Sequence, residues 1–329
     1  MLCMKEEHIR PKEIHDKYIE LSKKDADTFF PINKKRIQIN CPACNSNETN
    51  FIFQKYNFHY ELCNECGTLF NSPRPSLEDF KIFYEDSPSS NYWSDVFFPS
   101  VEKIRIKELI RPKALKIFEY FSVKEKKVNS IVDVGSGKGT FLEEWQKISN
   151  DTDLYAVEPS KKMSEICRDK GINTLENIVE EASEFHGIAD LAVSFETIEH
   201  VQDPLLFVSS IRKLLKEGGY MLMTGICYDG FDIQTLGINS KTISPPFHIN
   251  FMSLKGYQLL LKRAGFSEIE VITPGILDFD IVLNSLNHVE PQMKNFVELI
   301  NARGEDVAKM FQQFLINAKL SSHAWIIAK

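Results

Sequence analysis

The stretch IVDVGSGKGTF, residues 131–141, runs from an apolar segment into three closely spaced glycines and then into a helical pattern. The apolar segment, 128–134, predicts a buried strand, and 139–149 predicts the helix that follows it. Glycine is required at such a turn because a ligand can approach the backbone only where no Cβ lies in the way. Open α/β sheets bind ligands at the carboxyl ends of their strands, so we expect a binding site at this turn.

Strand and helix patterns alternate along the chain beyond this turn. Apolar runs predict strands over 154–157, 172–175, 191–195, 220–224, 266–272 and 323–328, and helical patterns cover 161–170, 204–216 and 254–264. Such alternation indicates an α/β fold with a mostly parallel, doubly wound sheet. Two segments, 225–252 and 274–322, exceed the usual connection length, and insertions of that size usually serve a site or an interface.

The glycine spacing and two acidic residues indicate what binds at the turn. The NAD fingerprint spaces its glycines G-x-G-x-x-G, whereas Gly135, Gly137 and Gly139 follow G-x-G-x-G. Asp133 lies within the preceding strand, where its carboxylate suits a cationic, amino-bearing ligand better than a pyrophosphate. Glu158 ends the next strand and can accept hydrogen bonds from ribose hydroxyls. Together these features favour S-adenosylmethionine over NAD.

Four cysteines form two CxxC pairs, Cys41 with Cys44 and Cys63 with Cys66, and 18 residues separate the pairs. Each pair can direct two thiolates at one point, and four thiolates complete the tetrahedral set of a structural Zn²⁺ site. A redox motif would need one CxxC at a strand-to-helix junction. Because four protein ligands leave no position for a substrate, we expect a structural zinc ion in a ribbon whose aromatic strands span 51–60.

Composition and charge narrow the classes of function. The chain is 43% hydrophobic and 26% charged, an ordinary globular balance. Its formal net charge of −7 comes without a basic surplus in either the ribbon or the main part, which disfavours nucleic acid as a partner. A membrane helix needs about 18 consecutive apolar residues, and no stretch of the sequence comes near that length. The N-terminus lacks the apolar core of a signal peptide. We therefore expect a cytoplasmic protein without a membrane span.

On these motifs, residues 125–329 resemble the class I methyltransferases. The first motif of that family matches Asp133 and the three glycines, and its ribose-binding acid matches Glu158. The resemblance implies a Rossmann-like sheet of seven strands whose last strand is antiparallel beside the fifth, as SSHAWIIAK would supply. The combination of CxxC…CxxCG, NSPRP, SFETIEHVQDP and FHINFMS is similar to methyltransferases of bacterial surface-polysaccharide clusters and to zinc-bearing sugar C-methyltransferases.

These observations predict four parts of the chain. They are an N-terminal extension over 1–36, a zinc ribbon over 37–78, a helical connector or lid over 79–124, and an S-adenosylmethionine-binding domain over 125–329 that carries the two insertions. We expect the cofactor to contact residues at the ends of the first, second and fourth strands of that domain. These are Asp133, Gly135, Ser136, Gly137, Gly139, Glu158, Pro159, Phe195 and Glu196.

Methyl transfer requires a positioned acceptor and, for a hydroxyl or an amine, a group that removes a proton. His200, after the fourth strand, and His248, in the first insertion, are the candidate bases, with Glu199 beside His200. Glu196, Glu199 and His200 also form an ExxEH set that could bind a divalent cation. The same set occurs in ubiquinone-pathway O-methyltransferases and in small-RNA 3′-end methyltransferases. In the latter, the resemblance implies that a later histidine, here His248, completes a Mg²⁺ site. We favour a base over a metal site, and a purely structural turn stays open.

The leading hypothesis is an S-adenosylmethionine-dependent methyltransferase of a small molecule or glycan, namely a sugar or sugar-nucleotide of surface-polysaccharide synthesis. One alternative is an RNA methyltransferase that binds RNA through the ribbon, which the neutral ribbon and acidic main domain disfavour. Others are a non-catalytic cofactor-binding scaffold and a nicotinamide-dependent oxidoreductase. The apolar stripe over 311–315 is typical of a helix core or of an oligomer face, so an oligomer stays open.

Overall fold

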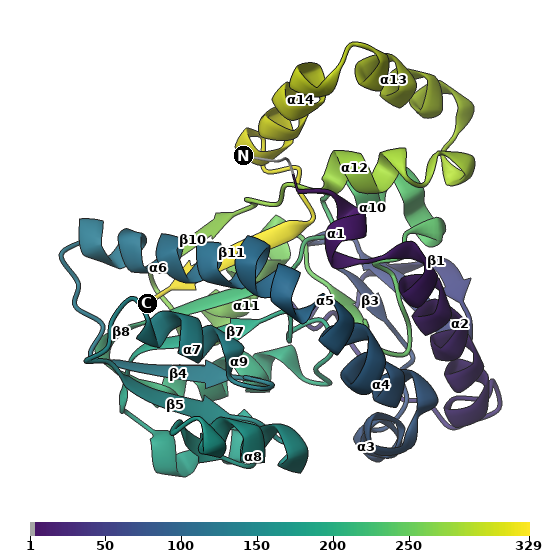
Figure 1. The fold of residues 1–329 in the computed structure, drawn as a ribbon. Helices are drawn as coiled ribbons and strands as arrows, with labels where there is room; N and C mark the ends of the chain where they lie inside the picture. Colours follow the sequence, from purple (N-terminus) through teal and green to yellow (C-terminus); the bar gives the residue numbers. More distant parts are fainter. Residues whose placement is uncertain (1–3) are drawn as a thin grey trace.

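The computed structural model describes residues 4–329 and is built around a seven-stranded sheet (Figure 1). The strand order is β10-β11-β8-β7-β4-β5-β6. Its strands are β4 Ser130–Val134, β5 Asp153–Val157, β6 Asn173–Leu175, β7 Ala189–Phe195, β8 Leu215–Ile226, β10 Ile269–Ile272 and β11 His323–Ala328. β11 runs antiparallel to both of its neighbours, while β4 to β8 pair in parallel. The predicted α/β, Rossmann-like fold is therefore confirmed.

Helices cover both faces of this sheet, which is why its central strands are apolar on both sides. One face packs against α6 Arg111–Val123, α7 Thr140–Gln146 and α8 Lys161–Asp169, and the other against α9 Pro204–Leu214 and α11 Leu254–Arg263. On β4, Ile131 belongs to the first core and Val132 to the second. β8 begins at Leu215, earlier than the predicted 220, because Leu215 pairs with Ala189 before the register shifts.

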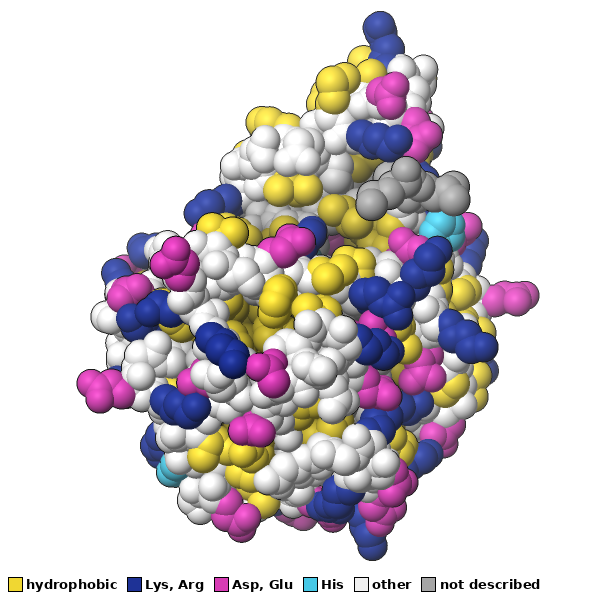
Figure 2. All heavy atoms as spheres, turned by 60° about the vertical axis from the view of Figure 1, so that its left-hand side comes forward, with side chains coloured by type: hydrophobic (Ala, Val, Ile, Leu, Met, Phe, Trp, Pro, Cys, Tyr) yellow, Lys and Arg dark blue, Asp and Glu magenta, His cyan; other side chains and the backbone are white. Residues whose placement is uncertain are grey.

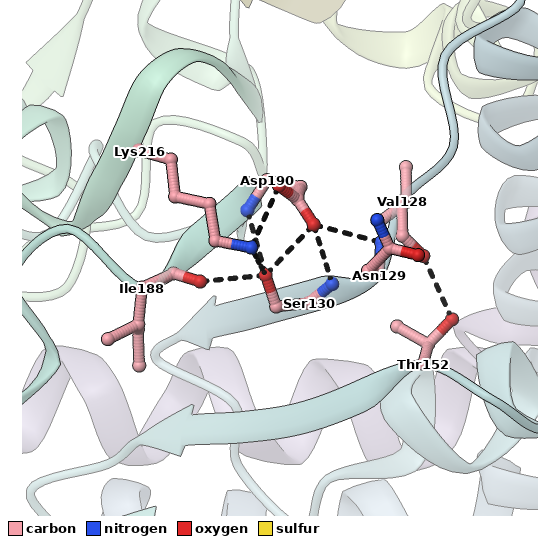
Figure 3. Close-up of polar contacts among 7 residues, drawn as sticks. All are labelled: Val128, Asn129, Ser130, Thr152, Ile188, Asp190 and Lys216. Carbon is pink, nitrogen blue, oxygen red and sulfur yellow. Dashed lines mark hydrogen bonds and ion pairs between the residues drawn. The ribbon is translucent and has the colours of Figure 1, made fainter.

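The amino ends of β4, β7 and β8 are tied together by a polar network (Figure 3). The Asp190 carboxylate accepts hydrogen bonds from the backbone amides of Asn129 at 2.9 Å and Ser130 at 3.0 Å. The Lys216 ammonium donates to Asp190 and to the Ser130 hydroxyl, both at 2.9 Å. That hydroxyl donates in turn to the Ile188 carbonyl at 2.7 Å. The amino end of the sheet is therefore held by polar groups that serve as one another's hydrogen-bond partners.

A second, smaller sheet contains the predicted ribbon, in the order β1-β2-β3-β9. Its strands are β1 Thr49–Lys55, β2 Phe58–Cys63, β3 Leu69–Asn71 and β9 Asn250–Phe251. β9 comes from the first insertion and pairs antiparallel with β3, placing Asn250 opposite Phe70. The cysteine-bearing sheet is therefore completed by a segment some 180 residues further along the chain, counted from that pair. Its boundaries as a separate domain stay a prediction.

Helices before the main domain pack across the junction of the two sheets (Figure 1). They are α1 Glu6–Ile9, α2 Lys12–Phe29, α3 Leu77–Asp86, α4 Pro88–Tyr92 and α5 Phe98–Arg105, with π-helical turns at Trp93–Phe97 and Ile106–Ile110. The second π-helical turn leads directly into α6, whose second residue, Pro112, lacks an amide hydrogen.

The second insertion forms a helical arm that projects from the body of the molecule (Figure 1). It holds α12 Asp278–Leu283, α13 Pro291–Ala302 and α14 Glu305–Asn317, and it packs on α10 Phe231–Leu236 from the first insertion. Phe296, Leu299, Met310 and Phe314 leave apolar surface exposed along the arm. Across residues 4–329, none of the helices has both the length and the apolar character that crossing a membrane requires.

Candidate functional site

The glycine turn after β4 has the backbone conformation that its sequence predicts. Gly135, Gly137 and Gly139 have φ of +74°, +54° and +68°, the left-handed region that favours glycine. A Cβ on Gly139 would lie 2.7 Å from Ile172 Cδ1, so that glycine also allows close packing. A Cβ on Gly137 would meet nothing within 4 Å. Gly137 therefore faces open space, where a ligand has room to approach the backbone.

Glu158, at the end of β5, holds this turn in place. One carboxylate oxygen accepts a hydrogen bond from the Gly137 amide at 2.8 Å, and the other accepts one from the Ser160 amide at 2.9 Å. Burial raises the pKa of Glu158, and these two amides oppose the rise. Each oxygen keeps a lone pair after the backbone bond, so the carboxylate can still accept from a ligand hydroxyl.

Asp133, inside β4, carries a buried carboxylate with one oxygen that lacks a hydrogen-bond partner among the described residues. The residue is 2% exposed, and its Oδ1 has no hydrogen-bond partner among residues 4–329. Burial, and then the charge of Glu158, raise the pKa of Asp133 to about 8, against the attraction of Lys113. An unpaired buried acid costs stability unless something completes it. A cationic, amino-bearing ligand would do so, and the site therefore fits S-adenosylmethionine.

The other predicted cofactor residues lie at the same edge of the sheet with different surroundings. The Phe195 ring, at the end of β7, lies 4.6 Å from the Phe141 ring and 4.3 Å beneath the Lys113 ammonium. The Ser136 hydroxyl lies 3.7 Å from Cys167 Sγ. Pro159 directly follows Glu158 at the end of β5.

Glu196 follows β7 and lies against the first residue of β11. It has a φ of +49°, which is uncommon for a residue other than glycine. Its Oε1 accepts a hydrogen bond from the Thr224 hydroxyl at 2.6 Å and lies 3.3 Å from His323 Nδ1. His323 Nε2 accepts from the Trp325 indole at 3.1 Å, so Nδ1 carries the proton that points at Glu196.

His200 and His248 lie together although 48 positions separate them in the sequence. Their rings are 4.9 Å apart at the centroids and nearly perpendicular. His248 Nδ1 donates to the Thr242 carbonyl at 2.6 Å, which leaves Nε2 free to accept a proton, and His200 Nδ1 lies 3.3 Å from the Tyr84 hydroxyl. Burial, and then the neighbouring His248, lower the pKa of His200 to about 3, and burial lowers that of His248 to about 4. Both rings are therefore neutral near pH 7.

Glu199 completes a group with these two histidines. One ligand atom from each of Glu199, His200 and His248 lies within 4.8 Å of the others. Glu199 is 2% exposed, and its Oε2 has no hydrogen-bond partner among the described residues. Burial, and then the charge of Glu196, raise its pKa well above the usual value. The group could hold a divalent cation, or it could move a proton.

Three residues near this site were not predicted from the sequence: Lys113, Tyr84 and His323. His323 could have been found, because the first residue of an antiparallel strand lies at the carboxyl edge of its parallel neighbours. Lys113 comes from α6, and Tyr84 comes from α3. Nothing in their local sequence indicates which part of the sheet those helices cover.

The four predicted zinc ligands are brought together by two similar turns. Cys41 Sγ lies 3.6 Å from Cys66 Sγ, and Cys44 Sγ lies 3.5 Å from Cys63 Sγ. All four sulfurs lie within 4.8 Å of one another. An ion about 2.3 Å from each sulfur of a tetrahedron would hold the sulfurs about 3.8 Å apart, so the cysteines fit Zn²⁺.

Comparisons with known proteins agree with this geometry at the level of the domain. Residues 105–271, just over half of the chain, match the family model described as a methyltransferase domain. No curated protein matches the sequence.

Several solved structures are similar to the chain. A SAM-dependent methyltransferase from Archaeoglobus fulgidus is 19% identical over 71% of this chain and 100% of that one, with a TM-score of 0.48. The plantazolicin methyltransferase BpumL in complex with SAH is 17% identical over 75% and 93%, with a TM-score of 0.49. An O-methyltransferase of a trans-AT PKS multienzyme from Brevibacillus brevis is 16% identical over 69% and 74%, with a TM-score of 0.45.

The glycine turn, its two acids and the antiparallel last strand all lie within a chain of which the family model matches more than half. The chain belongs to the methyltransferase-domain family and is an S-adenosylmethionine-dependent methyltransferase.

Proposed function

We propose that this methyltransferase acts on a small molecule or glycan, namely a sugar or sugar-nucleotide of surface-polysaccharide synthesis, and that His248 or His200 removes the acceptor proton. One observation carries the proposal: two neutral histidines lie in contact at the edge of the sheet that also carries Glu196 and the glycine turn. A neutral imidazole can accept a proton, whereas an imidazolium cannot. His248 is the stronger candidate because its Nδ1–H is already donated to Thr242, so Nε2 is the accepting atom.

The cofactor would be held by the groups around the glycine turn. The incomplete Asp133 carboxylate suits the amino group of S-adenosylmethionine, and Glu158 suits its ribose. The open side of Gly137 gives the ligand access to the backbone. When bound, S-adenosylmethionine supplies a methyl group on a positively charged sulfur. The protein contributes orientation of the acceptor and a place for its proton.

A divalent cation at Glu199, His200 and His248 is the second candidate role for this group, supported by their mutual distances. Its donor set of two imidazoles and one carboxylate suits zinc, manganese or iron better than Mg²⁺, which prefers oxygen ligands. Addition of Mg²⁺, Mn²⁺ or Zn²⁺ to chelator-treated enzyme separates the two roles. Activity that survives chelation supports the base, and activity restored by one metal alone supports the cation.

Two steps test the main proposal. Calorimetry with S-adenosylhomocysteine should show binding that NAD does not compete with, and an absence of binding would contradict the cofactor assignment. Labelled S-adenosylmethionine is then incubated with nucleotide sugars, glycans and RNA. Methylation of RNA in preference to the others would overturn the substrate class. On the face shown in Figure 2, basic and acidic side chains are interspersed, which does not favour RNA.

The base assignment has its own test, with any acceptor that the wild-type enzyme methylates. His248→Ala and His200→Ala should each lower kcat by about 10²-fold or more if that residue is the base. A loss of only a few-fold in both variants would remove the histidines from this role.

We also propose that the four cysteines hold a structural zinc ion. The support is their sulfur spacing and the positive φ of Asn45 and Gly67, which follow the two pairs and let each turn close. Metal analysis after dialysis should find one zinc per chain, and Cys63→Ser should lose it. Retention of an intact fold with no metal would contradict the assignment.

A further inference from the structure

Arg74 lies between the cysteine-bearing sheet and α3. It is buried and forms no salt bridge within residues 4–329, although the charge of Asp203 favours its charged form. The residue is 2% exposed, and burial lowers the pKa of its guanidinium to about 10, so it stays charged near pH 7. Its three hydrogen bonds all reach uncharged oxygens. It donates from Nε to the Asn71 carbonyl at 3.2 Å, from Nη1 to the Gln202 carbonyl at 2.7 Å, and from Nη2 to Asn250 Oδ1 at 3.0 Å. Burying a cation in this way is costly, and two of the three bonds lead toward the catalytic edge.

Asn250, on β9, continues this connection into the turn after β7. Its side-chain amide donates to the carbonyls of Ile198 at 3.1 Å and Val201 at 2.8 Å. Its backbone amide and that of Ile249 both donate to the Glu199 carbonyl, at 3.2 Å and 2.8 Å. The Asn250 side chain thus uses both donors and one acceptor, and a smaller or differently shaped side chain could not make the same three bonds.

The turn over 198–202 depends on these donors. Its carbonyls accept from Asn250, Ile249 and Arg74 at four of five positions, and the exception within residues 4–329 is His200. The local backbone bond that closes the turn runs from the His200 amide to the carbonyl of Thr197, just before the turn, at 3.0 Å. The backbone of the turn that carries Glu199 and His200 is therefore held by groups that belong to the smaller sheet and its edge.

We propose that Arg74 and Asn250 are positioning residues for the Glu199–His200 turn, and that the cysteine-bearing sheet, through β9, is part of the acceptor site's framework. The inference rests on the proposed function, because it takes that turn to be catalytic. Its physical basis is independent of the acceptor: a turn with one local backbone bond is held from outside by a buried arginine and an asparagine.

Hydrogen exchange of the full-length protein tests the inference without a known acceptor. Arg74→Gln and Asn250→Ala should speed exchange in peptides covering 196–202 and 247–252 by about tenfold or more, since each loses hydrogen bonds that hold the turn. Peptides of β4 and β5 should exchange as in the wild type, and affinity for S-adenosylhomocysteine should change by less than about twofold. Arg74→Lys, which keeps the charge but not the fork of donors, should be intermediate.

Arg36→Gln is the matched control. Arg36 is a partly buried arginine of the same region, and it donates a hydrogen bond to the Phe30 carbonyl at 3.1 Å and places its guanidinium over the Phe58 ring. It should leave exchange in 196–202 unchanged. Faster exchange throughout the chain in Arg74→Gln and Asn250→Ala, or unchanged exchange in the turn, would overturn the positioning role.

Activity gives a separate readout once the acceptor panel has yielded a substrate. The two variants should then lower kcat by about tenfold while leaving the KM for S-adenosylmethionine unchanged. Faster exchange in 196–202 without a loss of kcat would show that these residues position the turn but that the turn is not catalytic. That result would contradict the proposed function and not the hydrogen-bond arrangement. A rise of about tenfold in the KM for S-adenosylmethionine, as large as the loss of kcat, would contradict the positioning role.

Discussion

The amino and carboxyl edges of the main sheet differ in how their acidic side chains are paired. At the amino end, Asp190 accepts from two backbone amides and from Lys216, and the pKa of its carboxyl is lowered by these partners although burial alone would raise it. At the carboxyl end, Asp133 and Glu199 each keep a buried oxygen without a hydrogen-bond partner among residues 4–329, and their pKa values are raised.

We attribute this difference to a division between a part that holds the fold and a part that we propose binds a ligand. A fold gains nothing from an incomplete buried carboxylate. Such a group persists where a ligand or a reaction completes it, which is why perturbed acids gather at functional sites. We expect the two edges of the sheet to respond in opposite ways to the same kind of change.

The largest effect is expected from Asp133→Asn on ligand affinity. Loss of a charged hydrogen bond worth about 1.5–3 kcal/mol should weaken S-adenosylhomocysteine binding by about 10- to 150-fold in calorimetry. The free protein should be no less stable than the wild type, because an incomplete buried acid has been removed. Unchanged affinity would mean that Asp133 does not meet the ligand.

Asp190→Ala should do the reverse. It leaves two backbone amides and the Lys216 ammonium without their acceptor, and we expect a loss of about 2–3 kcal/mol in the free energy of unfolding, measured with urea. Affinity of the folded protein for S-adenosylhomocysteine should stay within about twofold. A large loss of affinity at full stability would show that the two ends are not separate in function.

Alanine at two glycines of one turn gives a finer comparison. Gly137→Ala and Gly139→Ala both place a side chain at positive φ, at a cost of about 1–2 kcal/mol. Gly139→Ala adds the close approach to Ile172 and should be the less stable variant in urea. Gly137→Ala points its methyl group into open space and should lose more ligand affinity for a smaller loss of stability. The reverse ranking would place the ligand elsewhere.

The pH dependence of stability gives a further comparison, in which the two acids should have opposite signs. The folded pKa of Asp133 is about 8, above the unfolded value near 3.9, so its contribution is present at low pH and is lost as pH rises toward 8. Asp190 has a lowered folded pKa, so its contribution is present above about pH 4 and is lost as pH falls.

Urea midpoints between pH 3 and pH 9 measure both contributions. Relative to the wild type, Asp133→Asn should gain stability toward pH 8, and Asp190→Asn should lose most above pH 4. Parallel pH profiles for the two variants would contradict the assignment of opposite shifts.

Much of the fold follows from local sequence signals. Apolar runs, glycine stops and the Asp203-Pro204 start of α9 each act over a few residues, and the seven strands of the main sheet lie where these signals predict them. β9 was not predicted, because a two-residue strand has no periodicity. It forms because Asn250 and Phe251 meet the edge of β3.

The candidate site also has features that local sequence predicts and contacts that only the tertiary structure makes. Spacing within one segment was enough to predict the glycine turn with its two acids and the cysteine quartet, since each uses residues close together or in matched pairs. The meeting of His200 with His248, the contact of His323 with Glu196, and the Arg74–Asn250 connection join segments far apart in the chain. Only the packing of the smaller sheet and of β11 against the carboxyl edge brings these groups together, because contacts of that kind depend on tertiary structure and leave no periodic trace in the sequence.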